Sequence, residues 1–174
     1  MLIIVCGLPG SGKTTIAEAL SKKLGGCYLS SDIIRKEMKG LPSYDEDEKR
    51  GVYKQMAFRT LQLFRGGEET IVLDATFYKR EYIEMAKNAA QKAGSVLRII
   101  VCKLDEAETK KRLDARKAGP SDADYQIYLK VKSEAEGIGE DHLELDSSKP
   151  LDKCLQDIVA YIERMENVGE GSDI

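Results

Sequence analysis

The chain has little of the residues that build metal centres and disulfide frameworks. Tryptophan is absent, and histidine occurs once, at His142. None of the four cysteines forms a C-x-x-C pair, so the sequence argues against a zinc site. If His142 lies far from the active site, a general base must be a carboxylate. Reduced thiols and the lack of an export signal lead us to expect a cytoplasmic protein.

Long hydrophobic runs and an excess of one charge are also missing. No apolar stretch approaches the ~18 residues that a membrane span needs, so we expect no membrane partner. The net charge is −3, from 27 basic and 30 acidic residues. Such a balance creates no global field that attracts nucleic acid, although it is compatible with a local basic patch.

A complete phosphate-binding motif stands near the start of the chain. Residues 7–14 read GLPGSGKT, which matches G-x-x-x-x-G-K-[ST]. An apolar segment of strand length, 2–6, precedes the motif, and a helical pattern with Ile16 and Leu20 on one face follows it. This strand–loop–helix context favours a nucleotide site over the alternative, a glycine-rich turn that binds nothing.

The motif predicts which residues bind ATP and Mg²⁺. Glycines let several backbone N–H groups point into one concavity, and the helix N-terminus adds its positive end there. Lys13 is expected to reach the outer phosphates and to be catalytic, while the Thr14 hydroxyl is a candidate Mg²⁺ ligand. The expected nucleotide-binding residues are Gly7, Pro9, Gly10, Ser11, Gly12, Lys13, Thr14 and Thr15.

Apolar strands alternate with helical patterns along the chain. Strands are expected at about 2–6, 26–30, 70–74, 97–103 and 141–146, from the apolar runs between turn signals. Helices are expected at about 13–24, 32–39, 48–65, 79–93, 105–117, 121–136 and 150–166. Two apolar stripes at helical spacing are Tyr53, Ala57, Leu61 and Phe64, and Leu151, Leu155, Ile158 and Ile162.

This alternation predicts an α/β fold: a three-layer αβα sandwich of the P-loop NTPase type, with a five-stranded parallel sheet and a small helical lid. We expect one domain over residues 1–166, with the lid at about 105–136 and a frayed tail at 167–174. Ligands of such sheets bind beyond the carboxyl ends of the strands. Gly7, Ser30–Asp32, Asp74–Thr76 and the segment after Lys103 should therefore surround one cleft.

Two carboxylates follow predicted strands. Asp32 and Arg35 are three residues apart, so they share a helical face. Asp32 could accept the proton of an attacking hydroxyl, and Arg35 could hold a substrate anion or position that carboxylate. The alternative is that Ser31 or Asp32 only caps a helix. Asp74 ends an apolar strand and could hold Mg²⁺ or contact the substrate, or it could be an ordinary turn residue.

A basic segment precedes a clear chain break. Arg112 and Arg116 are four residues apart on one helical face, and Gly119-Pro120 interrupts the helix before Ser121–Asp124 begins another. A helix–break–helix unit of this kind would make a lid whose arginines neutralise a transferring phosphoryl group. A solvated basic helix face is the alternative. No N-K-x-D segment is present to bind guanine, so ATP is the expected donor.

Four segments together resemble a known group of enzymes. GLPGSGKT, SSDIIRKE, VLDATFYKREY and KKRLDARKAGPSDADYQIY are similar to the small P-loop kinases related to polynucleotide kinase, zeta-toxin, gluconate kinase and adenylylsulfate kinase. The resemblance implies phosphorylation of a hydroxyl with Mg-ATP. Carried over by position, it implies that Asp32 activates the hydroxyl and that Arg35 contacts the substrate. It also implies that Asp74 lies on the substrate or metal side and that Arg112 and Arg116 are lid arginines.

Three functions are compatible with these observations. The first is a kinase for a hydroxyl of a small molecule, nucleoside or nucleotide. The second is a polynucleotide 5′-hydroxyl kinase, which the balanced charge does not favour because strand binding needs a positive groove. The third is a nucleotide-binding module that controls a partner protein without an acceptor substrate, which would not need Asp32 or lid arginines.

Overall fold

The computed structural model describes residues 1–38, 45–115 and 124–170, and its sheet is the one that the alternating pattern predicted. Five strands pair in parallel in the order β2-β3-β1-β4-β5. The strands are β1 (Leu2–Cys6), β2 (Cys27–Ser30), β3 (Ile71–Asp74), β4 (Leu97–Lys103) and β5 (Leu143–Asp146). The central strand β1 is apolar and buried throughout, as expected for a parallel strand covered on both faces.

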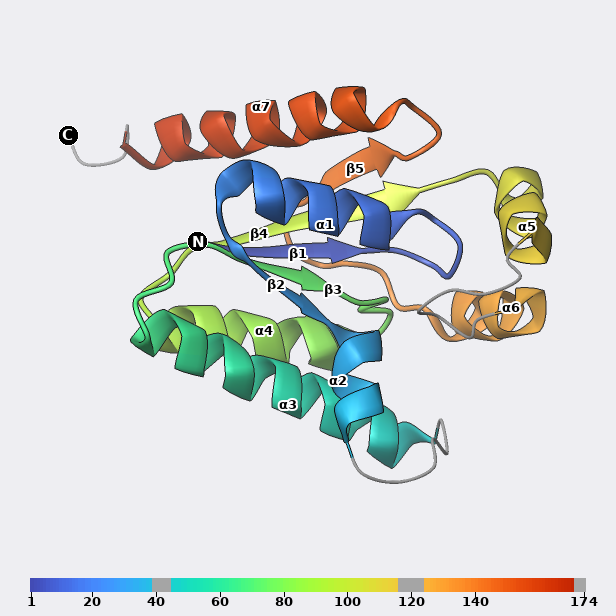
Figure 1. Cartoon of the computed structure of the whole chain (residues 1–174), viewed down its shortest axis with the longest axis horizontal. Helices are drawn as coiled ribbons and strands as arrows, with labels where there is room; N and C mark the ends of the chain where they lie inside the picture. Colours follow the sequence, from blue (N-terminus) through green and yellow to red (C-terminus); the bar gives the residue numbers. More distant parts are fainter. Residues whose placement is uncertain (39–44, 116–123, 171–174) are drawn as a thin grey trace.

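Helices cover both faces of this sheet (Figure 1). Helices α1 (Lys13–Leu24) and α7 (Leu151–Glu170) lie on one face, and α3 (Glu46–Arg65) and α4 (Arg80–Lys92) lie on the other. The shorter helices α2 (Ser31–Glu37), α5 (Glu106–Ala115) and α6 (Tyr125–Glu134) lie toward the edge where the strands end. The predicted three-layer αβα sandwich is therefore confirmed. None of the helices in the described ranges has both the length and the apolar character to cross a bilayer.

The core consists of two apolar layers, one on each face of the sheet. Because side chains alternate along a strand, Ile3 and Val5 pack toward α1 and α7, while Leu2 and Ile4 pack toward α3 and α4. The residues of the two expected apolar stripes are only partly the residues that these helices bury. Helix α3 buries Val52, Tyr53, Met56 and Thr60. In α7, Ile158 and Ile162 are buried together with Cys154 and Tyr161, whereas Leu151 is 38% exposed.

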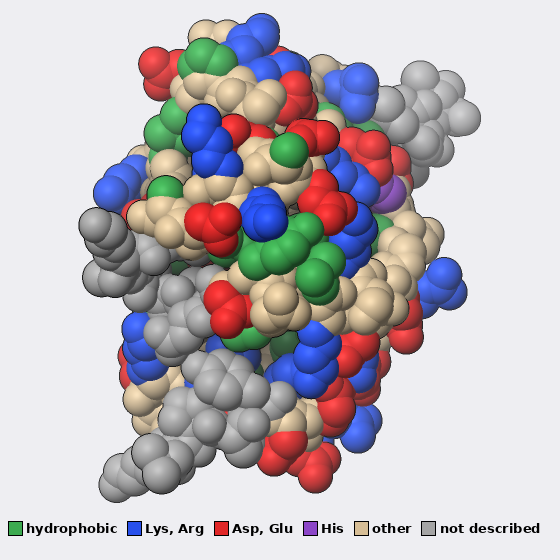
Figure 2. Space-filling model, turned by 90° about the vertical axis from the view of Figure 1, so that its right-hand side faces the viewer, with side chains coloured by type: hydrophobic (Ala, Val, Ile, Leu, Met, Phe, Trp, Pro, Cys, Tyr) green, Lys and Arg blue, Asp and Glu red, His purple; other side chains and the backbone are tan. Residues whose placement is uncertain are grey.

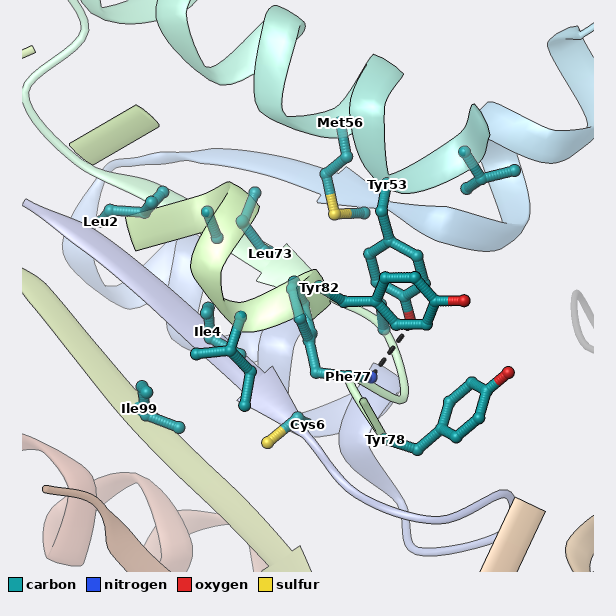
Figure 3. Close-up of a cluster of buried hydrophobic side chains, with 14 of the residues drawn as sticks. Leu2, Ile4, Cys6, Tyr53, Met56, Leu73, Phe77, Tyr78, Tyr82 and Ile99 are labelled. Atoms are coloured by element: carbon teal, nitrogen blue, oxygen red, sulfur yellow. Dashed lines mark hydrogen bonds between the residues drawn. The ribbon is translucent and has the colours of Figure 1, made fainter. Parts of the chain in front are cut away.

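An aromatic cluster on the α3 and α4 face of the sheet holds the loop that follows β3 in place (Figure 3). The rings of Tyr53 and Tyr82 stack with centroids 3.9 Å apart. The backbone N of Phe77 donates to the Tyr53 hydroxyl at 3.0 Å, and that hydroxyl is 3.1 Å from Thr76 Oγ1. Phe77 has a φ of 46°, which is unusual for a residue with a side chain. Tyr53 therefore holds the β3–α4 loop in a conformation that the loop alone would rarely adopt.

The expected helix bounds differ from the structure mainly at α6 and α7. Helix α6 begins at Tyr125, where the Asp124 side chain accepts from Ile127 N at 2.9 Å; residues 121–123 lie outside the described ranges. It ends at Glu134 rather than 136, because Ala135 turns to an extended conformation and Glu136 N donates to Tyr78 O. Helix α7 continues to Glu170, beyond the expected end at 166.

Candidate active site

Three strand ends meet at the phosphate loop. In the sheet register, Ser30 lies beside Asp74, and Asp74 lies beside Val5, two residues before Gly7. On the other side of β1, Cys6 pairs with Val101, near the end of β4. The structure thus brings together the segments that the strand-end rule placed around one cleft.

The loop can adopt its shape only because glycines occupy its tightest positions. A Cβ on Gly7, which has a φ of +146°, would lie 2.6 Å from the carbonyl oxygen of Cys102. A Cβ on Gly10, with a φ of +83°, would lie 2.9 Å from the Thr109 methyl group and 3.0 Å from Leu113 Cγ in α5. Strand β4 and helix α5 therefore press directly against the loop, which leaves no room for side chains there.

The remaining loop residues lead into α1. Lys13, Thr14 and Thr15 form its first turn, and Gly12 precedes it as the N-cap. Pro9 and Ser11 are buried. Glycine at the N-cap supplies no side-chain cap, so the backbone N–H groups of the first turn are available to an anion. This geometry fits the phosphates of a nucleotide.

Asp74 ends β3, and one of its carboxylate oxygens has a hydrogen-bond partner while the other has none among the described residues. It is 3% exposed, and the Tyr28 hydroxyl donates to its Oδ2 at 2.7 Å. Its Oδ1 has no hydrogen-bond partner among the described residues. Burial raises the pKa of Asp74 above its ordinary value, while the Lys13 charge and hydrogen bonds with Tyr28 and Thr14 act in the opposite direction. Tyr28 was not predicted as a site residue.

An orphaned carboxylate oxygen near a threonine hydroxyl fits a magnesium site. Thr14 and Asp74 are the two predicted metal ligands, and the Thr14 hydroxyl is among the groups that act to lower the pKa of Asp74. No cluster of three or more His, Cys, Asp or Glu side chains suited to a metal occurs in the described part of the chain. Magnesium prefers one or two protein oxygens combined with phosphates and water, so two protein ligands are the number expected for a magnesium ion bound together with a nucleotide.

Asp32 belongs to an ion-pair network on α2 and α3. Arg35 Nη1 lies 3.1 Å from Asp32 Oδ1, and Arg35 Nε lies 3.0 Å from Glu48 Oε1. The N-cap of α2 is Ser30, whose hydroxyl accepts from Asp32 N at 3.3 Å. Neither Ser31 nor Asp32 is therefore the cap, and the Asp32 carboxylate is held by Arg35. Asp32 comes two residues after Ser30, which lies beside Asp74 in the sheet register, and its negative charge contributes to raising the pKa of Asp74.

Helix α5 places an arginine against the loop. Arg112 Nη1 lies 3.5 Å from the position of a Cβ on Gly12, and its Nε lies 3.2 Å from Glu108 Oε1. The second predicted lid arginine, Arg116, lies outside the described residues. Helix α6 is tied to α5 through the Tyr125 hydroxyl, which donates to Glu106 Oε1 at 2.7 Å.

The sequence argument for a carboxylate base required that His142 lie far from the phosphate loop. The structure does not meet this condition. His142 lines a pocket that Gly7 and Ser11 also line. Its Nδ1 lies 2.8 Å from the carbonyl oxygen of Glu140, and its Nε2 lies 3.9 Å from Glu144 Oε1. Asp32 is therefore favoured as the base by its position at the strand ends and not by elimination.

These features define a class. A parallel sheet of this strand order, a GLPGSGKT loop between β1 and α1, and helices on both faces make the chain a P-loop protein with the fold of the small kinases. The chain belongs to the AAA domain family (AAA_33), whose model matches residues 2–137.

Individual relatives agree with this class. The chain is 29% identical over 122 residues to a probable gluconokinase of Schizosaccharomyces pombe, covering 67% of this chain. Among solved structures, a gluconokinase from Sinorhizobium meliloti superimposes with a TM-score of 0.75 at 22% identity, covering 98% of this chain and 96% of the other. The APS kinase CysC of Mycobacterium tuberculosis, solved with AMPPNP and APS, gives a TM-score of 0.72 at 17% identity, covering 93% and 96%.

The chain does not span the full length of its curated relatives. It spans 63% of the Schizosaccharomyces pombe protein and 33% of uncharacterized mycobacterial proteins to which it is 24% identical. The structural matches, at these identities, establish the fold.

Proposed function

We propose that the protein is an ATP- and Mg²⁺-dependent kinase that transfers the γ-phosphate to a hydroxyl of a small molecule. The observation that carries this proposal is the position of Asp32. It is held by Arg35 two residues after Ser30. Ser30 lies beside Asp74 in the sheet register, and Asp74 lies beside Val5, two residues before the phosphate loop. A hydroxyl-activating carboxylate beside a phosphate-binding loop is what hydroxyl phosphorylation requires.

Each residue has a defined part in the proposed reaction. The acceptor oxygen attacks the γ-phosphorus, and the bond from that phosphorus to the bridging oxygen of ADP breaks. Asp32 accepts the hydroxyl proton, and Arg35 keeps its carboxylate in position. Lys13 and Arg112 neutralise negative charge on the phosphates, and Arg116 is proposed to join them. Bound Mg²⁺, held by Thr14 and Asp74, would supply further neutralisation of the phosphate oxygens.

The names of the relatives support kinase chemistry on a small molecule. The proteins from Schizosaccharomyces pombe and Sinorhizobium meliloti are named as gluconokinases, and the mycobacterial structure as an APS kinase. Within the kinases, we propose that the chain is related to the polynucleotide kinase and zeta-toxin group, on the segments SSDIIRKE and VLDATFYKREY. A small-molecule acceptor is favoured over a polynucleotide, because acidic and basic side chains alternate over the strand-end face of the described residues (Figure 2).

The other candidate is an ATP-binding regulatory module without an acceptor. Such a module needs the phosphate loop, but it has no use for the Asp32–Arg35–Glu48 network. That network keeps a partly exposed carboxylate at the cleft, which favours the kinase.

Label transfer distinguishes these functions. The protein is incubated with Mg²⁺ and ATP labelled at the γ-phosphate, together with separate nucleosides, sugars, sugar acids and 5′-hydroxyl oligonucleotides. We expect label on a small molecule, and its loss in Lys13→Ala, because Lys13 is directed at phosphates and not at the core. Tight ATP binding without transfer to any compound would favour the regulatory module. Transfer by Lys13→Ala within about tenfold of wild type would exclude this loop as the active site.

A further inference from the structure

A pocket of about 400 Å³ lies beside the phosphate loop, on the side of the sheet that faces α4. Gly7, Leu8 and Ser11 of the loop form one wall. The segment 135–138, which follows α6, forms another. This volume lies within the range of small-molecule sites, so the pocket is large enough for an acceptor adjoining the site of transfer.

Hydrogen bonds hold the 135–138 wall against the β3–α4 loop and the start of α4. Glu136 N donates to Tyr78 O at 2.8 Å, and Glu136 Oε2 accepts from Arg80 N at 2.8 Å. Arg80 Nε donates to Gly137 O at 3.1 Å. The facing loop contributes Thr76, which the Tyr53 hydroxyl contacts at 3.1 Å. The pocket is therefore formed before any ligand arrives, as small-molecule sites usually are.

The buried hydroxyl of Ser11, on the phosphate-loop wall of the pocket, indicates a ligand. Ser11 lines the pocket and is 3% exposed, yet its Oγ has no hydrogen-bond partner among the described residues. Buried polar groups are rarely left without a partner, and exceptions call for an explanation such as an unseen ligand. Ser11 is also one of the expected nucleotide-binding residues, so a ligand at this wall would lie next to the phosphates of the nucleotide.

The charges around the pocket select the kind of ligand. Lys103 is the only Lys or Arg side chain among the described residues that line it, and its Nζ lies 3.2 Å from Glu144 Oε1. Two glutamates, Glu136 and Glu144, outnumber that lysine. Arg35, the other candidate for an anion contact, already bonds to Asp32 and Glu48. A carboxylate or phosphate on the acceptor would therefore meet more negative than positive charge.

The walls are otherwise mainly apolar and aromatic. Leu8, Phe77, Tyr78, Val101 and Tyr128 line the pocket. Phe77 and Tyr78 belong to the aromatic cluster under the sheet, in which Tyr78 packs edge-on to Tyr82. Apolar walls with a few polar groups suit a ligand that combines a flat or apolar body with hydroxyls.

We propose that this pocket binds the phosphate acceptor, and that the acceptor is an uncharged hydroxyl compound with an aromatic or apolar body, of the nucleoside class. This inference rests on the proposed kinase function and narrows it: anionic acceptors, among them sugar acids and nucleotides, are disfavoured. The acceptor hydroxyl forms the new bond to the γ-phosphorus, ADP leaves, and the hydroxyl proton passes to Asp32. Asp32 is not a lining residue of the pocket, so the reacting hydroxyl must project from the pocket toward the end of β2.

Two glycines of one segment provide a matched pair of variants. Gly137 lines the pocket, whereas Gly139 does not. A Cβ on either glycine would meet no atom within 4 Å, and neither has a left-handed φ. Gly137→Phe therefore adds bulk at the pocket wall, and Gly139→Phe adds the same bulk outside it with a similar demand on the fold.

The experiment measures binding and transfer with the full chain. Uridine, uridine 5′-monophosphate and gluconate are titrated by calorimetry in the presence of Mg²⁺ and a non-hydrolysable ATP analogue, which occupies the nucleotide site. We expect uridine to bind at least tenfold more tightly than the two anions. Gly137→Phe should weaken uridine binding at least tenfold without changing ATP affinity, and Gly139→Phe should stay within twofold of wild type.

Three results would overturn the proposal: anions that bind as well as uridine, a Gly137→Phe variant that binds uridine normally, or no binding of uridine at all. Its failure is distinguishable from failure of the proposed function. Suppose that phosphate transfer to some compound depends on Lys13 and that Gly137→Phe does not change its rate. This result would refute the pocket assignment, but it would still support the proposed kinase function. Suppose instead that Gly137→Phe weakens uridine binding but that the protein transfers phosphate to no compound. This result would support the pocket as the uridine site and would refute the proposed kinase function.

Discussion

Replacing Asp74 by asparagine should make the free protein more stable and its nucleotide complex less stable. Asp74 is 3% exposed, with Oδ1 orphaned and Oδ2 bonded to Tyr28. An orphaned buried polar atom costs about 1–3 kcal/mol, and more when it is charged. Asparagine keeps the size and can still accept from Tyr28, but its own amide stays buried. We therefore expect a net gain of about 1 kcal/mol, or ~2–4 °C in Tm for a domain of this size.

The gain should depend on pH with a definite sign. Because burial raises the pKa of Asp74 above its ordinary value of 3.8, the folded protein holds the proton more tightly than the unfolded chain does. The cost of the ionised carboxylate is therefore complete above the folded-state pKa, and it fades as the pH falls toward 3.8. The stability advantage of Asp74→Asn should be full at pH 7 and should shrink in acid.

Thermal melts with and without Mg-ATP measure both effects. Ligand at a hundredfold excess over its dissociation constant stabilises a protein by about 2.7 kcal/mol, and Asp74→Asn should gain less than wild type because it lacks one of the two proposed metal ligands. Asp146 provides the control: it ends β5 as Asp74 ends β3, but hydrogen bonds from Ser148 lower its pKa. Asp146→Asn should therefore give no gain. A free Asp74→Asn protein that melts below wild type at pH 7 would refute the reasoning.

Three further variants test separate parts of the site. Arg112→Ala should lower kcat far more than it raises the KM for ATP, since charge neutralisation in the transition state appears in kcat; an unchanged kcat in steady-state assays would make Arg112 an ordinary surface residue. Tyr28→Phe removes the hydrogen-bond donor of Asp74, so denaturant titration should show that the free energy of unfolding falls by about 1–3 kcal/mol. Activity should also need a higher Mg²⁺ concentration. An unaltered Mg²⁺ requirement would argue against Tyr28 as a positioning residue. Tyr53→Phe leaves the buried N–H of Phe77 without its acceptor, so urea titration should show that the free energy of unfolding falls by about 1–3 kcal/mol. A variant as stable as wild type would mean that the β3–α4 loop keeps its conformation without Tyr53.

The sheet and the phosphate loop could be predicted because local sequence determines them. A continuous apolar run such as Leu2–Cys6 is typical of a central parallel strand, and the spacing of glycines in GLPGSGKT demands one loop geometry. The strand-end rule then placed Asp32 and Asp74 at that loop without any knowledge of side-chain contacts.

The hydroxyl and carboxylate contacts that support the site could not be predicted. Tyr28 and Asp74 are 46 residues apart, and Tyr53 and Phe77 are 24 apart; both pairings depend on strand register and helix rotation. The sequence marked Tyr53 only as part of an apolar stripe, and it did not single out Glu48 at all. The alternative that Ser31 or Asp32 caps α2 is wrong, since the cap is Ser30; helix starts read from sequence are uncertain by about one or two residues.

The kinase account depends most directly on Asp32. Asparagine has about the same size, and the cap of α2 is Ser30, so Asp32→Asn removes the proposed base together with its charge and its ion pair with Arg35 and leaves the cap in place. The measurement is label transfer from ATP to the best acceptor, with ATP affinity and thermal stability determined on the same samples. The account predicts that kcat falls by about 10²–10⁴ while ATP affinity and stability hold. A loss smaller than tenfold, with the acceptor KM unchanged, would contradict it and leave Asp74 as the carboxylate to test.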